Sequence, residues 1–167
     1  FKTTFAARSL MSYLNKFEIE TSYGIKAWKR WGNTAEQIIK SNPYVLCIQG
    51  VDLSFSRADA VAAKSDIPAD SECRIKAGIT YILRQNADQG HTCLPLDSLV
   101  KTAVSYLDVD EKLIKKVIED ETEEENLYYY DKHGRRFVML ADFYKAEDYI
   151  ARRLAIMRQI SYDNKID

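Results

Sequence analysis

Helix-ending signals recur at short intervals through the first 64 residues, so no helix in that part of the chain can be long. Gly32 follows one segment of helical periodicity. Asn42-Pro43-Tyr44 follows the next, and the residue before a proline is pushed out of the helical region. A tight stretch over 49–55 precedes a further segment. The pattern predicts short helices joined by tight turns, over residues 9–14, 26–31, 33–41 and 56–64.

Two of these helices begin with a polar residue that is suited to capping. Asn33 precedes Glu36 by three residues, which is the spacing of a capping box. Ser56 stands in the same relation to Asp59. We therefore expect Asn33 and Ser56 to be N-caps, whose side chains accept hydrogen bonds from backbone N–H groups of the first turn.

The spacing of the apolar residues changes after Ile67-Pro68, where the proline interrupts the helical pattern. A longer helix is expected over 72–86, and its apolar side repeats at helical spacing through Ile75, Ile79, Ile82 and Leu83. An extended piece over 91–94 follows, and then a helix over 95–107.

The remaining chain predicts a helix, a hairpin and a closing helix. Asp108 is expected to cap a helix over 110–121. Strands over 127–130 and 136–140 flank a loop in which Gly134 suits a positive φ. A long helix over 142–160 comes last.

These elements predict a mainly α fold, namely a helix-hairpin-helix bundle followed by a winged-helix-like unit with a small β-hairpin. The expected divisions are 1–66 for the helix-hairpin-helix region, 67–90 for a connecting helix and 91–167 for the winged-helix-like region. The acidic run Glu119–Glu125 opposes insertion of that unit's second helix into a groove lined with phosphates. We therefore expect the second region to be structural or to contact protein.

A run of three tyrosines, Tyr128-Tyr129-Tyr130, raises the possibility of base stacking. Alternate residues of a hairpin point to opposite faces, so one or two of these rings are expected in the core.

Charge is distributed unevenly along the chain, although the net charge is only −1. Residues 1–64 hold 9 Lys/Arg and 5 Asp/Glu, whereas residues 65–126 hold 7 and 14, and residues 127–167 hold 8 and 6. Binding of a polyanion follows local charge. The first region is therefore the expected place for nucleic acid.

The sequence lacks the residues that nucleotide binding, metal binding or nucleophilic catalysis would require. No Gly-Lys dipeptide occurs, so a nucleotide-binding P-loop is excluded. Three cysteines without Cys-x-x-Cys spacing predict core or half-buried thiols in a reducing cytoplasm, and two histidines give no convincing metal or nucleophile site. No apolar run reaches the length of a membrane span. We expect no cofactor, no metal, no catalytic residue and no membrane contact, and a chain cut from a longer protein.

The segment 46–64 fits a helix-hairpin-helix, which binds DNA phosphates through hairpin N–H groups and the start of the following helix without reading bases. Neighbouring cations and hydroxyls would add phosphate contacts. The candidates are Lys26, Lys29, Arg30, Ser54, Ser56, Arg57 and Lys64. A helical corner with a solvated basic face explains the same pattern equally well.

A family resemblance rests on an ordered set of motifs in this region. The set comprises Asn42-Pro43-Tyr44, Leu46, Phe55, Ala58-Asp59 and Ala62, then Ile67-Pro68, Arg74-Ile75, Gly90-His91-Thr92 and Leu94-Pro95. It resembles the "NPY-x-L … GIGF-x-x-AD-x-x-A" and "GHTYLP" elements of RecD-like DNA helicases, relatives of the alpha subunit of exodeoxyribonuclease V. Residues 144–154 are similar to the helix that leads into that family's ATPase domain. The resemblance spans roughly residues 17–157.

The resemblance implies an accessory region of an ATP-dependent DNA helicase, acting in repair or recombination. ATP and Mg²⁺ are then expected only in a motor domain that lies outside this sequence. The implied partners are single-stranded or forked DNA, the motor domain and other repair subunits. One departure stands out, because Asp52-Leu53-Ser54 replaces the family's hairpin Gly-Ile-Gly, and Asp52 would repel a phosphate.

Two other classes of function compete with DNA binding by the first region. The chain could be a protein-interaction or scaffold module that holds the motor to its partners. It could also be an unrelated winged-helix regulator that reads bases with the helix 110–121, which the acidity of that helix disfavours.

Overall fold

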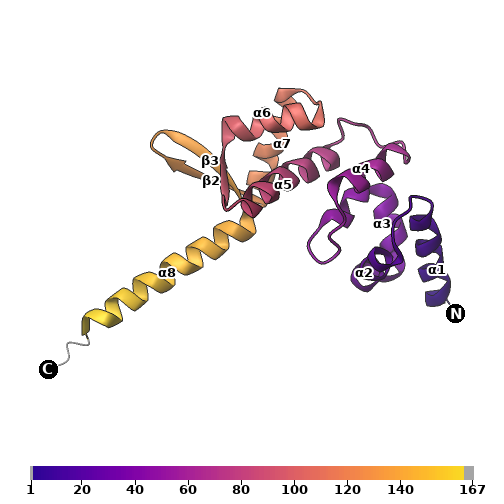
Figure 1. The fold of residues 1–167 in the computed structure, drawn as a ribbon, viewed down its shortest axis with the longest axis horizontal. Helices are drawn as coiled ribbons and strands as arrows, with labels where there is room; N and C mark the ends of the chain where they lie inside the picture. Colours follow the sequence, from indigo (N-terminus) through magenta and orange to yellow (C-terminus); the bar gives the residue numbers. More distant parts are fainter. Residues whose placement is uncertain (1, 164–167) are drawn as a thin grey trace. The chain divides into compact units, whose positions relative to one another are not determined.

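The computed structural model describes residues 2–163, with side chains for residues 5–158, and the chain divides into two compact units that meet between Tyr81 and Ile82. The first unit is entirely helical (Figure 1). Its elements are α1 (Lys2–Asn15), α2 (Thr21–Trp31), the 3-10 helix η1 (Gly32–Thr34), α3 (Ala35–Ser41), the 3-10 helix η2 (Pro43–Cys47), α4 (Phe55–Ala63) and the first part of α5 (Glu72–Asp88).

Helices α1, α2 and α3 pack against one another and enclose the first part of the core. Leu10 and Leu14 of α1, Ala27 of α2 and Ile39 of α3 are almost completely buried. The short helices therefore gain their stability from shared apolar burial, since isolated helices of this length are marginal in water.

The helix boundaries confirm some of the sequence signals. Gly32 ends α2 with a φ of 56°, and α3 ends at Ser41, directly before Asn42-Pro43. The side chain of Asn42 accepts a hydrogen bond from the backbone N–H of Tyr44 at 3.0 Å, so it caps η2. The proline therefore ends one helix and begins the next turn.

The predicted caps are wrong in the first unit. Asn33 lies inside η1, because the turn after Trp31 tightens into a 3-10 helix, and Thr34 takes the N-cap position of α3. Ser56 lies inside α4, whose N-cap position is Ser54. Neither of these two N-cap residues makes a side-chain capping hydrogen bond.

Asp59 does not take part in a cap but ties three elements together. Its carboxylate accepts hydrogen bonds from the Tyr44 hydroxyl at 2.6 Å and from the Arg74 guanidinium at 2.7 and 3.2 Å. Burial by itself would raise the pKa of Asp59, but the hydrogen bonds from Arg74 and Tyr44 outweigh it and lower that pKa. Asp59 therefore stays charged and joins η2, α4 and α5.

Three aromatic rings stack beside this network. The ring of Phe55 lies 5.6 Å from that of Tyr44 and 5.7 Å from that of Tyr81, each with an interplanar angle of 25°. Tyr44 precedes the hairpin and Phe55 follows it. The stack therefore closes the hairpin at its base.

The second unit holds the rest of α5 and a small antiparallel sheet (Figure 1). Its elements are β1 (Cys93–Pro95), α6 (Leu96–Leu107), α7 (Glu111–Glu123), β2 (Leu127–Lys132), β3 (Arg135–Leu140) and α8 (Ala141–Asp163). The strand order is β1-β3-β2. The core lies where α6 and α7 meet the sheet, and its buried side chains include Leu99, Ala103, Ile114, Ile118 and Val138.

The expected helices of this half are present, with one corrected cap. Asp108 does not cap α7 but ends α6 in the left-handed conformation, with a φ of 54°. Asp110 caps α7 instead, and its carboxylate accepts the backbone N–H of Lys112 at 2.8 Å. Both positions suit Asp, which tolerates the left-handed region and also favours N-caps.

The apolar side predicted for α5 is confirmed, because Ile75, Ile79, Ile82 and Leu83 are all buried. Within residues 2–163, no helix combines the length and the apolar character that crossing a membrane requires.

Replacing Asp59 by Ala is expected to lower the free energy of unfolding by about 2 kcal/mol, because it leaves the Tyr44 hydroxyl and the Arg74 guanidinium without their shared acceptor. Chemical denaturation of the purified chain measures the loss. Asp70→Ala is the matched control, since Asp70 is exposed. An equal effect of both substitutions contradicts the assigned role.

The loss of unfolding free energy caused by Asp59→Ala should depend on pH. The pKa of Asp59 is lower in the folded chain than its ordinary value of 3.8. Its stabilising contribution is therefore complete at neutral pH and is lost as the pH falls through the folded-state pKa. The difference between wild type and Asp59→Ala should shrink below about pH 4.

Candidate nucleic-acid interface

The hairpin between η2 and α4 is tightly closed. The backbone N–H of Leu53 donates to the carbonyl of Leu46 at 2.9 Å, which brings the two ends together. Gly50 has a φ of 96° and Asp52 a φ of 64°, so the turn needs two left-handed residues. Asp52 stands where the resemblance to RecD-like helicases implies a glycine, and Asp is among the few other residues that adopt this conformation. Ser54, where the resemblance implies the other glycine, has an ordinary φ of −64°.

The backbone donors of the hairpin are already occupied. The N–H groups of Val51 and Asp52 both donate to the carbonyl of Ile48, at 3.1 and 3.0 Å. The N–H of Gly50 donates to the Asp52 carboxylate at 3.0 Å. With the Leu53 N–H bound to Leu46, four successive N–H groups have internal acceptors. Phosphate binding by these amides would require their rearrangement.

Side-chain cations from two helices converge beside the hairpin. Lys26 Nζ lies 5.6 Å from the centre of the Tyr23 ring, and the Arg57 guanidinium lies 5.9 Å from the same ring. Tyr23 and Lys26 belong to α2, whereas Arg57 belongs to the first turn of α4. One tyrosine therefore brings together two of the predicted DNA-binding residues that are 31 positions apart in the sequence.

Each of these two cations has an acidic or carbonyl partner. Lys26 Nζ donates to the Val51 carbonyl at 3.1 Å and lies 3.7 Å from the Asp52 carboxylate. Arg57 donates to the Glu18 carbonyl at 2.7 Å and lies 3.7 Å from the Glu20 carboxylate. These ion pairs are exposed, and exposed pairs contribute little to stability. A phosphate could therefore displace the carboxylates at small cost.

The other predicted residues extend this surface or lie away from it. Lys29 and Arg30 are exposed, and they follow Lys26 at the spacing of neighbours on one helix face. Ser54 and Ser56 lie at the start of α4, with their hydroxyls 3.4 Å apart. We call this surface the α2–α4 patch, and it consists of Tyr23, Lys26, Lys29, Arg30, Ser54, Ser56 and Arg57.

Lys64 is not part of the α2–α4 patch. It is the C-cap residue of α4, whereas Ser54 is the N-cap residue of the same helix. Ten residues of helix span about 15 Å, so Lys64 lies at the opposite end of α4 from the hairpin.

Sequence reasoning missed the ring of Tyr23 and the two partners of Arg57, which are the backbone carbonyl of Glu18 and the carboxylate of Glu20. Tyr23 precedes Lys26 by three residues, and that helical spacing is the signal that could have identified it. Glu18 and Glu20 lie between α1 and α2, far from Arg57 in sequence, and no local pattern links them to it.

The cysteines and the possible metal ligands give no catalytic or metal site among the described residues. All three cysteines are half-buried free thiols, as expected, and burial raises the pKa of Cys47 to about 12. In the described part of the chain, no group of three or more His, Cys, Asp or Glu side chains is placed to hold a metal ion.

The comparison with known protein families agrees with the hairpin architecture. The family model described as the ATP-dependent RecD2 DNA helicase HHH domain matches residues 3–93, more than half of the 167 residues. The match begins at the second residue of α1, covers the helices from there through α5 and reaches the first residue of β1. The resemblance noted beyond residue 93 stays a prediction. The chain belongs to the family of the HHH domain of ATP-dependent RecD2 DNA helicases.

Proposed function

We propose that the chain is a non-catalytic accessory region of a RecD2-like helicase acting in DNA repair or recombination, and that its α2–α4 patch binds DNA weakly and without sequence preference. The observation that carries the proposal is the convergence of Lys26 and Arg57 on the ring of Tyr23, beside the first turn of α4. Lys29 and Arg30 continue this positive surface along α2. Family membership supports a role beside a DNA motor.

Side-chain contacts, and not hairpin amides, carry the binding in this proposal. The hairpin N–H groups are already bound internally, whereas the cations of the α2–α4 patch are exposed or only loosely paired. Lys and Arg side chains hold phosphates without reading the bases. Single-stranded or forked DNA is the expected ligand.

The charge balance explains why the affinity should be low. The α2–α4 patch has four cations, but the carboxylates of Asp52 and Glu20 lie 3.7 Å from Lys26 and Arg57. A phosphate must compete with Asp52 for Lys26 and with Glu20 for Arg57. The expected binding is therefore strongest at low salt, where exposed charges are least screened.

A scaffold function is the second candidate, and α8 favours it. Its exposed apolar side chains include Tyr149, Ile150, Leu154 and Met157, whose exposed fractions lie between 55% and 64%. Large apolar side chains exposed in this number are typical of a surface that contacts another protein. The winged-helix assignment of the second unit remains a prediction. Its element order agrees with it.

The double substitution Lys29→Ala/Arg30→Ala is expected to weaken binding to a labelled single-stranded oligothymidylate. Loss of two phosphate contacts should reduce the slope of log affinity against log salt by about 1.4, since each contact on a single strand contributes about 0.7. Fluorescence anisotropy over a series of salt concentrations measures this slope.

The matched control for that test is Lys112→Ala/Lys116→Ala, which removes the same charge from the exposed face of α7. If both double variants change the slope equally, the α2–α4 patch is not the binding surface. If the wild-type chain does not bind single-stranded or forked DNA at low salt, the proposal of DNA binding fails.

Asp52→Asn is expected to strengthen DNA binding. Asn keeps the side-chain acceptor for the Gly50 N–H and tolerates the left-handed φ, so the substitution removes only the charge. The gain should be about two- to fivefold at low salt, the size of an exposed ion pair. Asp70→Asn is the control, and an unchanged affinity of Asp52→Asn would mean that Asp52 does not compete with phosphate.

A further inference from the structure

The β2–β3 hairpin of the second unit has two chemically different faces. It closes at His133-Gly134, whose φ values are 51° and 73°. Tyr130 pairs with Phe137, and Lys132 pairs with Arg135. Alternate residues of a strand point to opposite faces, so these two pairs share one face of the hairpin. Near the tip, that face presents an aromatic pair followed by a pair of cations.

The opposite face is electrically balanced. Arg136 pairs with Asp131 in register, and Arg136 Nε lies 3.1 Å from the Asp131 carboxylate. The Arg136 guanidinium also lies 4.8 Å from the centre of the Tyr129 ring. The charge of Arg136 is therefore already compensated within the hairpin.

The pair Lys132 and Arg135 has no such compensation. Both residues are exposed, and neither forms an ion pair within the part of the chain that the structure describes. Like charges directly opposite each other on neighbouring strands destabilise a hairpin. An anion bound between them would remove that repulsion, so this face is suited to a phosphate.

The tyrosine run of β2 separates into three environments. Tyr128 stacks on Tyr144 of α8 with ring centres 4.2 Å apart and an interplanar angle of 4°. Tyr129 lies under Arg136. Tyr130 is 48% exposed, on the same face as Lys132 and Arg135. An exposed ring two residues along a strand from a cation lies about 7 Å from it, within the reach of one nucleotide.

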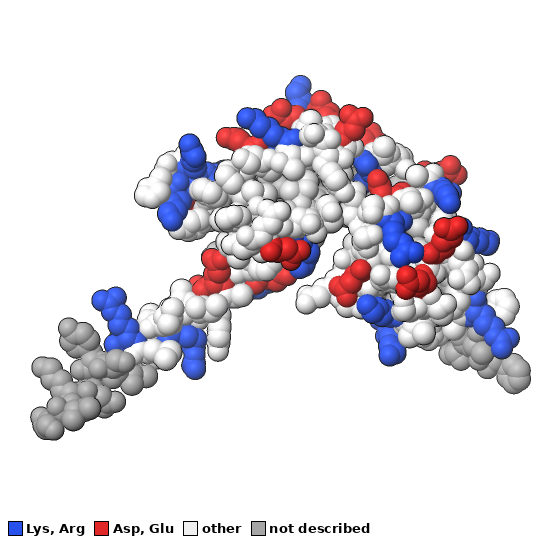
Figure 2. Space-filling model, in the orientation of Figure 1, with Lys and Arg blue, Asp and Glu red and all other residues white. Residues whose placement is uncertain are grey.

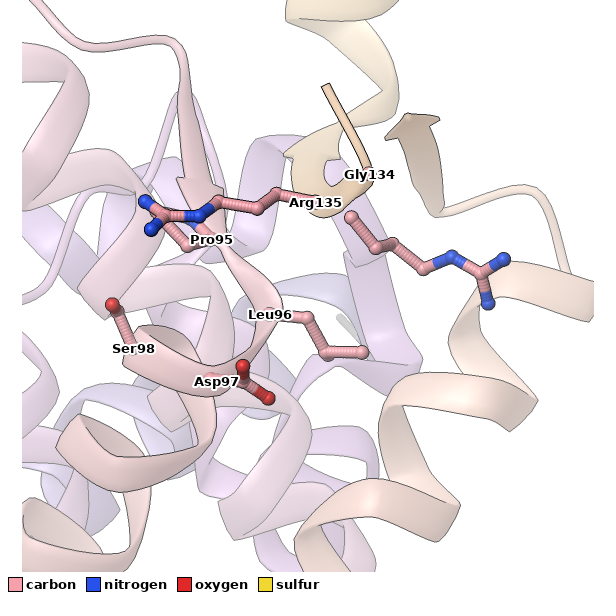
Figure 3. Close-up of a pocket in the computed structure, with 7 residues that line it drawn as sticks. Pro95, Leu96, Asp97, Ser98, Gly134 and Arg135 are labelled. Atoms are coloured by element: carbon pink, nitrogen blue, oxygen red, sulfur yellow. The ribbon is translucent and has the colours of Figure 1, made fainter. Parts of the chain in front are cut away.

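A cavity of about 350 Å³ borders the hairpin, but its walls carry opposite charges. Figure 3 shows the first turn of α6, with Asp97 and Ser98, opposite Gly134 and Arg135 of the hairpin. Arg136 also lines this space. The Asp97 carboxylate would repel an anion inside the cavity. Arg135 itself lines the cavity, so we place the phosphate between Lys132 and Arg135, outside the cavity and away from Asp97.

We infer that the β2–β3 hairpin is a second nucleic-acid contact, which binds single-stranded DNA through a base stacked on Tyr130 and a phosphate held by Lys132 and Arg135. Figure 2 shows Lys and Arg side chains over this hairpin. Base stacking on an aromatic ring tolerates every base, so the contact has no sequence preference. The inference uses none of the residues of the α2–α4 patch, so substitutions test the two sites separately.

The first test is Tyr130→Ala in the 167-residue chain, with anisotropy of a labelled oligothymidylate as the measurement. The affinity should fall about 5- to 150-fold, which corresponds to the loss of one stacked base. Tyr130→Phe should bind as the wild type does, because it keeps the ring. Tyr106→Ala is the matched control, since Tyr106 of α6 is 45% exposed and lies outside the hairpin.

A strand of the same length with abasic sites in place of thymines separates stacking from charge. Tyr130→Ala should leave binding to this strand unchanged. The inference is overturned if Tyr130→Ala binds oligothymidylate as well as Tyr106→Ala does, or if it loses the same affinity for the abasic strand.

The cations are tested with Lys132→Ala/Arg135→Ala. This variant should reduce the salt slope by about 1.4 on oligothymidylate, and its melting temperature without DNA should not fall, because a repulsive pair has been removed. Lys112→Ala/Lys116→Ala provides the same change of charge on α7. An equal reduction of the slope by the control, or no reduction by Lys132→Ala/Arg135→Ala, rejects the phosphate site.

Each hairpin variant is also made in the Lys29→Ala/Arg30→Ala background. If the hairpin effects persist there and Lys29→Ala/Arg30→Ala alone has no effect, the α2–α4 patch fails and the hairpin stands. If only Lys29→Ala/Arg30→Ala weakens binding, the hairpin inference is wrong. If the wild-type chain does not bind, both proposals fail.

Discussion

The carboxylate of Asp59 holds the first unit in the form on which its candidate interface depends. It accepts hydrogen bonds from Tyr44, which precedes the hairpin, and from Arg74 of α5. The ring of Phe55, stacked on Tyr44, fixes the start of α4 on the other side of the hairpin. Tyr44, Phe55, Asp59 and Arg74 are also residues that carry the family resemblance. That part of the signature therefore describes how the hairpin is closed.

For the hairpin between η2 and α4, closure of the turn and the capacity to bind phosphate are separate properties. Asp52 adopts the left-handed conformation that a glycine would adopt there, so the turn keeps its shape. Its carboxylate accepts the Gly50 N–H and approaches Lys26, so the same residue occupies a donor and a cation that a phosphate would need. Membership of the family thus establishes the fold without establishing that the hairpin amides contact DNA. Any affinity of the first unit for phosphate must then come from the side chains around this hairpin.

The sequence predicts the helices and boundaries that depend on the spacing of nearby residues. It does not predict features that depend on contacts between residues far apart in the sequence. The apolar side of α5 and the end of α3 before Asn42-Pro43 follow from residues within one or two turns. The N-caps do not follow from local spacing. Asn33 and Asp108 are the predicted caps, but the helices begin later, so that Thr34 and Asp110 take the N-cap positions of α3 and α7. The site shows the same limit. Seven candidate residues could be named, but the ring of Tyr23 that joins two of them, and the acids that pair with them, come from other segments.

Although the net charge is −1, two local surfaces carry groups of positive side chains, namely the α2–α4 patch and the exposed face of the β2–β3 hairpin. In the first unit, the cations of the α2–α4 patch are loosely paired with acids, so a phosphate must displace a carboxylate to bind. On the exposed face of the β2–β3 hairpin, Lys132 and Arg135 face each other and neither forms an ion pair among the described residues, so a bound phosphate would relieve their repulsion. An anion therefore meets a paired carboxylate at the α2–α4 patch, whereas at the β2–β3 hairpin the nearby acid is Asp97, which lines the cavity beside Arg135 without an ion pair to it. If both surfaces bind phosphate as proposed, the hairpin should have the lower electrostatic cost, and the acidic middle of the sequence does not change that comparison because binding follows local charge.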